Sequence, residues 1–131
     1  MTTVGGAIAE AIKAANLALS AAGQAVYRDI APEAATLPYV VFIDPISDVP
    51  VLSGGGAVLY RNRTAQVSLY QAQVGENDAL REGLLATLDG AELVASEEVL
   101  RCRVWTWHRI PADAFGVVQV DITLRIWHAG Y

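Results

Sequence analysis

The sequence predicts an α+β fold, with a mostly antiparallel sheet of about five strands and two helices packed on one face of it. Two segments repeat apolar residues at helical spacing, and several others alternate apolar with polar residues. Hydrophobic residues make up 53% of the chain and charged residues 18%, a globular composition that excludes disorder as the main state. With 131 residues, the chain has the length of one domain, so we assign 1–131 to a single domain.

The first predicted element is a helix near the N-terminus. Its apolar residues recur every three or four positions and lie on one side: Val4, Ile8, Ile12, Ala15 and Leu19. The helix should end near Gly23. Glu10 and Lys13 interrupt the apolar run and no basic leader precedes it, so we do not expect a signal peptide. No run of about 18 apolar residues occurs, and we expect no membrane contact.

Three strands should follow. Residues 25–30 predict a short strand before Pro32, and residues 38–44 predict a second that ends at Asp44-Pro45. Between positions 57 and 70 the chain alternates, with apolar side chains on one side: Ala65, Val67 and Leu69. This alternation is typical of a strand with one buried face.

A second helix and a hairpin complete the predicted fold. The helix should begin at Asn77 or Asp78 and end before Gly90, because its leucines are in helical register. Two alternating runs follow, 100–110 and 117–128, and the turn-forming residues "PADAFG" between them favour an antiparallel hairpin.

A flexible loop is predicted at about 46–57, around three consecutive glycines, Gly54, Gly55 and Gly56. A phosphate-binding loop needs a following Lys, a hydroxyl residue and a helix, whereas a strand pattern follows here. The loop also carries three apolar residues that a solvated loop would avoid: Val49, Val51 and Leu52. We therefore expect either an arm that docks on another subunit or a loop that packs on its own sheet.

Catalytic, metal and cofactor sites are not expected. The single Cys102 excludes an intramolecular disulfide and a cysteine-rich metal site. His108 and His128 should lie at opposite ends of the hairpin, on the order of 30 Å apart, too far to share an ion. No acid–base pair or nucleophile motif is present, so the sequence does not predict an enzyme. The net charge of −5 disfavours nonspecific binding of nucleic acid.

The most informative pattern is the polar side of the last two strands. In simple alternation one face would carry arginines and tryptophans together: Arg101, Arg103, Trp105, Trp107, Arg109, Arg125 and Trp127. Arginine and tryptophan are enriched at protein interfaces, and the chain has eight Arg against one Lys. A GC-rich genome also favours Arg, and a single Trp is often an ordinary surface or core residue. We predict a subunit interface on this face.

Residues 26–42, "VYRDIAPEAATLPYVVF", resemble the tail-terminator, or tail-completion, proteins of long-tailed bacteriophages. The segment "RTAQVSLYQ", the leucine-rich helix and the two terminal strands resemble the same family in order and spacing, from about residue 8 to 128. The glycine-containing loop matches no family element. The family has no catalytic residues to carry over.

The resemblance implies a virion protein of the head-proximal end of the tail, assembled in the host cytoplasm. Such proteins form a homo-hexameric ring that caps the tail tube, stops its polymerisation and offers a surface to the head-tail connector or stopper protein. DNA would pass through the ring without specific binding. Alternatives are another neck or connector ring, and a non-viral α+β domain that binds a small ligand on its tryptophan-rich face.

Overall fold

The computed structural model describes residues 3–95 and 98–128. A single sheet with strand order β1-β2-β3-β6-β5-β4 runs through the molecule, and only the β1–β2 pair is parallel. The elements in chain order are α1 (Val4–Ala14), a 3-10 turn η1 (Ala21–Gly23), β1 (Val26–Arg28), β2 (Tyr39–Leu52), β3 (Val58–Ala72), α2 (Asp78–Leu88), β4 (Glu92–Ala95), β5 (Glu98–Ile110) and β6 (Val117–His128).

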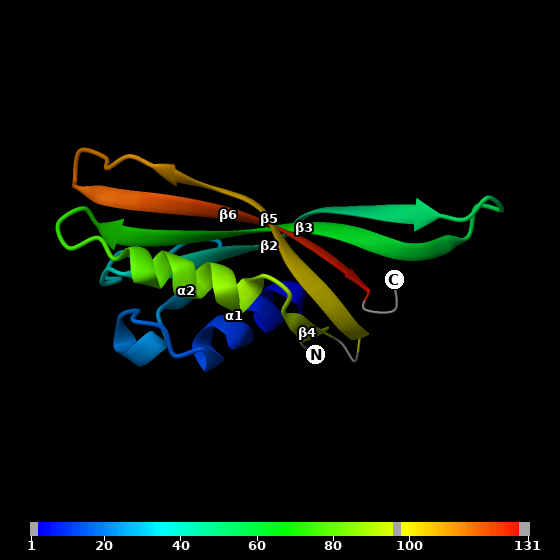
Figure 1. The fold of residues 1–131 in the computed structure, drawn as a ribbon, viewed down its shortest axis with the longest axis horizontal. Helices are drawn as coiled ribbons and strands as arrows, with labels where there is room; N and C mark the ends of the chain where they lie inside the picture. Colours follow the sequence, from blue (N-terminus) through cyan, green and yellow to red (C-terminus); the bar gives the residue numbers. More distant parts are fainter. Residues whose placement is uncertain (1–2, 96–97, 129–131) are drawn as a thin grey trace.

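Both helices lie on the same side of the sheet (Figure 1). The core forms between them and the inward side chains of the strands, where Ile8 of α1, Leu84 of α2 and Ile122 of β6 are fully buried. Ala65, Val67 and Leu69 of β3 are fully buried as well, as their alternation predicts. The predicted α+β class, with two helices on one face of a mostly antiparallel sheet, is therefore confirmed.

The first helix is shorter than its apolar pattern predicts. Thr3 caps its N-terminus by accepting a hydrogen bond from the amide of Gly6 at 2.9 Å, but the helix ends at Ala14 and Asn16 has a positive φ of 50°. The chain then turns back toward the sheet. Leu19 reaches the core through this turn and is 7% exposed. Ala15, predicted on the same stripe, is exposed, so beyond the helix the predicted burial holds only for Leu19.

The second helix matches its prediction closely. The side chain of Asn77 accepts a hydrogen bond from the amide of Ala79 at 3.0 Å, so Asn77 is the N-cap. Leu80, Leu84 and Leu88 are buried against the sheet. Gly90 follows the helix with a φ of +82°, a conformation that glycine adopts without strain.

A strand that we did not predict, β4, brings the sheet to six strands. It has four residues, of which Leu93 and Ala95 are buried. So short an alternation is indistinguishable from a loop in the sequence. Strand β4 pairs with the start of β5, so the segment after α2 forms one edge of the sheet.

The predicted loop at 46–57 is wrong in its secondary structure. Strand β2 continues through Leu52, although its pairing with β3 is irregular between Ile43 and Ser47, next to the proline that should have ended it. Only residues 53–57 connect the two strands, in a turn where Gly56 has a φ of +84°. The two strands form a long hairpin that projects beyond the helices (Figure 1). We call residues 48–61 the arm.

Candidate assembly interface

Strands β5 and β6 place an arginine-rich cluster on the outer face of the sheet, away from the helices. Arg101 pairs with Trp127 and Arg103 pairs with Arg125 across the two strands. Directly opposed residues on antiparallel strands project from the same face. The cluster is therefore basic on a chain whose net charge is −5.

The two opposed arginines of this cluster, Arg125 and Arg103, each have a separate interaction partner. The guanidinium of Arg125 lies 3.5 Å from the ring centroid of Trp105, a cation–π contact. Arg103 donates a hydrogen bond to the carboxylate of Asp89 at 3.2 Å. Trp105 remains 58% exposed, so the contact does not bury the ring. We call Arg101, Arg103, Trp105, Arg125 and Trp127 the outer cluster.

A β-bulge divides the face that the sequence predicts to be continuous. The register of β5 against β6 shifts between Val104 and Thr106, which inserts one extra residue. Beyond the shift, Trp107 pairs with the buried Ile122 and Arg109 with Val120, so both lie on the helix side. The prediction that all seven residues share one face is wrong for Trp107 and Arg109, because the bulge reverses the alternation.

On the helix side, Trp107 and Arg109 contact α2 and the segment before it. The guanidinium of Arg81 lies 4.8 Å from the ring centroid of Trp107. Arg109 donates two hydrogen bonds to the carboxylate of Glu76, at 2.9 and 2.8 Å. The hydrogen bonds from Arg109 hold the pKa of Glu76 below its ordinary value. These two residues therefore fasten the free end of the hairpin to α2.

An open groove runs between α2 and the outer edge of β5. Its apolar residues are Leu85, Ala86, Val104, Trp105 and Trp107, and its acidic ones are Glu82 and Asp89. Beyond the segment that pairs with β4, residues 105–110 of β5 have no strand neighbour on this side within the described chain. The groove thus combines an apolar floor with an unpaired strand edge. We call it the α2–β5 groove.

The arm exposes apolar side chains on a hairpin that no third strand flanks within the described residues. Pairing of β3 with β6 begins only at Arg63, and pairing of β2 with β1 involves only residues 40–42. The side chains of Val49, Leu52 and Val58 are each more than half exposed. The expectation that the segment packs on its own sheet therefore does not hold for Val49 and Leu52, whereas Val51 is half-buried. Docking of the arm on another subunit stays a prediction.

The base of the arm adjoins the outer cluster. Val49, Asn62, Thr64 and Arg125 line a small open cavity there, together with Arg63. The two regions that the sequence predicts to be interfaces are thus neighbours in the fold. The side chain of Arg63 lies on the other face of the sheet. There its guanidinium is 3.7 Å from the carboxylate of Asp48 and 3.8 Å from that of Glu98.

A row of tyrosines covers part of the outer face near β1. The rings of Tyr27 and Tyr39 meet edge to face at 5.9 Å, and those of Tyr39 and Tyr70 stack at 5.0 Å. Burial, followed by the charge of Asp121, raises the pKa of Tyr70. This row was not predicted, although the sequence places tyrosines at these strand positions.

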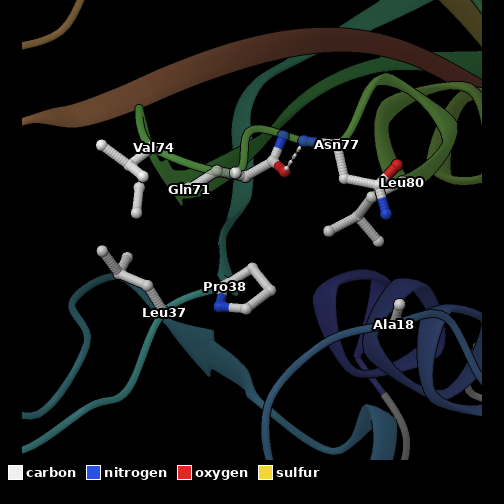
Figure 2. A pocket seen from close by; sticks show the side chains of 9 residues that line it. Ala18, Leu37, Pro38, Gln71, Val74, Asn77 and Leu80 are labelled. Carbon is white, nitrogen blue, oxygen red and sulfur yellow. Dashed lines mark hydrogen bonds between the residues drawn. The ribbon is translucent and has the colours of Figure 1, made fainter.

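The end of the sheet opposite the arm carries exposed apolar residues on three loops. Ile30, Val74 and Phe115 are 80, 92 and 90% exposed. A pocket of about 330 Å³ lies beside Val74, between the loop before α2 and the segment around Pro38 (Figure 2). Gln71 crosses it and accepts a hydrogen bond from the amide of Asn77 at 2.9 Å. Both ends of the molecule therefore expose apolar side chains.

Ser68, Asp121 and His108 meet on the outer face but do not form a catalytic triad. Ser68 donates a hydrogen bond to Asp121 at 2.7 Å, and the His108 ring lies 3.7 Å from the other carboxylate oxygen. The carboxylate stands between the hydroxyl and the imidazole, so the histidine has no contact through which to deprotonate the serine. Gln119 also donates to Asp121 at 2.7 Å, which completes a polar network across β3 and β6.

The remaining candidate nucleophile, the thiol of Cys102, lies in the core. Cys102 is fully buried, and burial raises the pKa of its thiol to about 12. Among the described residues no group of three or more metal-ligating side chains occurs, and no helix there is long and apolar enough to span a membrane.

Comparisons with known proteins identify the fold. No protein-family model matches the chain, and no curated protein is similar to it in sequence. A chain of the virion of the native gene transfer agent particle superimposes with a TM-score of 0.68 at 18% identity, over 96% of this chain and 94% of that one. A second solved structure, which carries no functional name, superimposes with a TM-score of 0.57 at 14% identity, covering 95 and 92%.

At these identities the likeness establishes a shared fold. It extends over nearly the whole length of both chains, so helices, sheet and arm belong to one architecture. That architecture also occurs in a virion particle.

Proposed function

We propose that this protein is a structural component of a phage or phage-like particle, and specifically a tail terminator. It forms a homo-hexameric ring that caps the head-proximal end of the tail tube and stops tube polymerisation. The other side of the ring receives the head-tail connector or stopper protein. The observation that carries the proposal is the shared fold with a virion chain across 96% of the sequence, together with the resemblance of residues 8–128 to tail terminators.

The distribution of surfaces supports a ring. The arm projects from one end of the sheet, and exposed apolar residues gather at the other, on the loops of Val74 and Phe115. A cyclic ring needs two different patches on each subunit and a stable contact buries roughly 800 Å² per partner. The arm, the outer cluster and the α2–β5 groove offer distinct patches for such contacts.

The charge of the chain supports passage of DNA without specific binding. The net charge is −5, and the arginines of the outer cluster are engaged by an aromatic ring or a carboxylate at Arg125 and Arg103. If the acidic residues face the lumen of the ring, its wall repels the phosphates of the DNA and lets it slide.

A second candidate is a connector or neck ring on the head side of the joint. The same fold observation favours it, because a virion chain with this fold need not belong to the tail. Cross-linking separates the two: links to tube protein support the terminator, and links only to portal or adaptor proteins support the connector. A small-ligand-binding domain would instead bind its ligand on the tryptophan-rich face and remain monomeric.

The test is the assembly state and the effect on tube length. Electron microscopy and mass photometry of the purified protein should give six-fold rings, and the rings should bind the ends of isolated tail tubes. Particles assembled without the protein should carry tubes of uncontrolled length. A protein that stays monomeric with tubes present and leaves tube length unchanged would contradict the proposal.

A further inference from the structure

We propose that the arm of one copy lies in the α2–β5 groove of a second copy. The contact deepens the proposed function, since it is the subunit contact from which the ring is built. Its partner is another molecule of this same chain. Four properties of the arm and the groove lead to this assignment.

The arm requires a cover that its own chain does not supply. A two-stranded hairpin without a third strand is only marginally stable in water. Residues 48–61 form such a hairpin, and the strand edges of both β2 and β3 are unpaired there within the described residues. Val49 and Leu52 on one strand and Val58 on the other remain exposed.

The groove offers what the arm lacks. Its floor carries apolar side chains, among them Leu85, Ala86 and Trp107, beside the unpaired edge of β5. An extended segment that adds to an exposed sheet edge gains backbone hydrogen bonds, and pockets along the edge accept its alternate side chains. An arm strand laid beside residues 105–110 would satisfy both edges at once.

The charges of the two surfaces are complementary. The arm, residues 48–61, is neutral, because Arg61 lies 3.2 Å from the carboxylate of Asp48, and Arg63 at its base brings the segment 48–63 to +1. The segment 76–89, which forms the other wall of the groove, has four carboxylates and one arginine and sums to −3. A second copy thus brings a neutral arm that carries Arg61, with Arg63 at its base, to an acidic wall, which favours encounter and fixes orientation.

The contact has to be between molecules. Figure 1 shows the arm projecting away from α2, from the side of the molecule opposite the tip of the β5–β6 hairpin. The arm continues two central strands and cannot fold back without breaking them. Arm and groove are different surfaces, so the contact is heterologous and repeats from copy to copy until a ring closes.

The first experiment is cross-linking between two singly substituted proteins, L52C on the arm and A86C in the groove. The native Cys102 is buried with a thiol pKa of about 12, so it stays silent toward maleimides in the folded protein. A short bis-maleimide should link the mixed sample. A matched control pairs L52C with F115C, which is 90% exposed and is not among the residues that line the groove. It should not link.

The second experiment exchanges charges across the contact. Arg61→Glu should weaken self-association about tenfold, and Glu82→Arg in the same chain should restore it, because the pair is then reversed. Arg61→Gln serves as the neutral control and should have a smaller effect. If Arg61→Glu weakened association only by unfolding the protein, a second charge reversal at Glu82 would not restore association. Restoration therefore shows that the two charges act across the contact.

The outcomes separate this contact from the proposed function. Rings that form without a link between L52C and A86C overturn the arm contact and leave the ring standing. A link inside dimers or filaments supports the contact but contradicts the ring. Links in L52C alone show arm-to-arm pairing and overturn the assignment. A protein that stays monomeric and unlinked at high concentration overturns both.

Discussion

Arg125 stacks on Trp105 at 3.5 Å, and this contact joins β6 to the single residue that the bulge inserts into β5. The pair sits on the outer face, above strands whose other side is core. An exposed arginine–tryptophan stack contributes about 0.5–1 kcal/mol to folding. Its ring is more than half exposed, so most of its apolar surface remains available to a partner.

Trp105→Ala should therefore weaken assembly more than folding. The variant loses a large interface side chain, whereas its chemical unfolding midpoint should change little. Arg103→Glu should behave similarly, because its exposed ion pair with Asp89 is worth at most about 1 kcal/mol. Mass photometry measures the first effect and urea unfolding the second. Equal losses in both would show that the outer cluster belongs to the core.

Trp107→Ala should differ by lowering the free energy of unfolding by about 2 kcal/mol, and it should weaken assembly as well, because Trp107 lies on the floor of the α2–β5 groove. Its ring packs on the helix side against Arg81 and is 39% exposed. The two tryptophans stand two residues apart, so they form a matched pair for urea unfolding. A Trp107 variant as stable as wild type would contradict the placement of this residue on the helix side.

The Glu76–Arg109 ion pair should make stability depend on acidity. The folded-state pKa of Glu76 lies below 4.5, its ordinary value, because Arg109 stabilises the carboxylate. The contribution of the pair is thus complete above about pH 4.5 and is lost as the pH falls through the lowered pKa. The stability difference between wild type and Glu76→Gln should shrink on acidification.

Arg109→Gln is the matched control for this pH dependence. It removes the same pair from the other side, so its unfolding free energy should converge with that of wild type over the same acidic range. The double variant should cost less than the sum of the two single ones. A stability difference that stays constant down to pH 2 would exclude the pair as its cause.

Glycine substitutions should distinguish a required turn from a permissive one. At Gly23, φ is +85° and an added Cβ would lie 3.3 Å from the carbonyl oxygen of Leu17, so Gly23→Ala should cost about 1–2 kcal/mol. At Gly54 nothing lies within 4 Å of such a Cβ, and Gly54→Ala should be neutral or slightly stabilising. Thermal unfolding of both variants provides the comparison.

Much of the fold could be predicted because its signals are local. The buried alternation of Ala65, Val67 and Leu69 and the leucine register of α2 are properties of short segments. The end of α1 was missed because Leu19 keeps the helical spacing of burial while the chain has already turned. Strand β4 was missed because four residues carry too little periodicity.

The candidate interface was only partly predictable, because a bulge is invisible in an alternating pattern. Nothing in "RVWTWHR" shows that the register shifts at Trp105, since the extra residue is defined by pairing with β6. The arm was predicted as a loop because Asp44-Pro45 and the glycines are turn signals, whereas pairing with β3 carries β2 past the proline. Both errors arise from contacts between strands.

The bulge in β5 also limits which changes of chain length the protein can absorb. Removing one residue between Val104 and Thr106 would close the bulge and leave Arg109 facing Glu76, whereas inserting one more residue there would turn Arg109 outward and place His108 toward the helices. An insertion in the 111–116 connection would leave both faces as they are. Homologous chains should therefore vary in the length of this connection, and between Cys102 and Arg109 they should lose the bulge residue more readily than they gain another one.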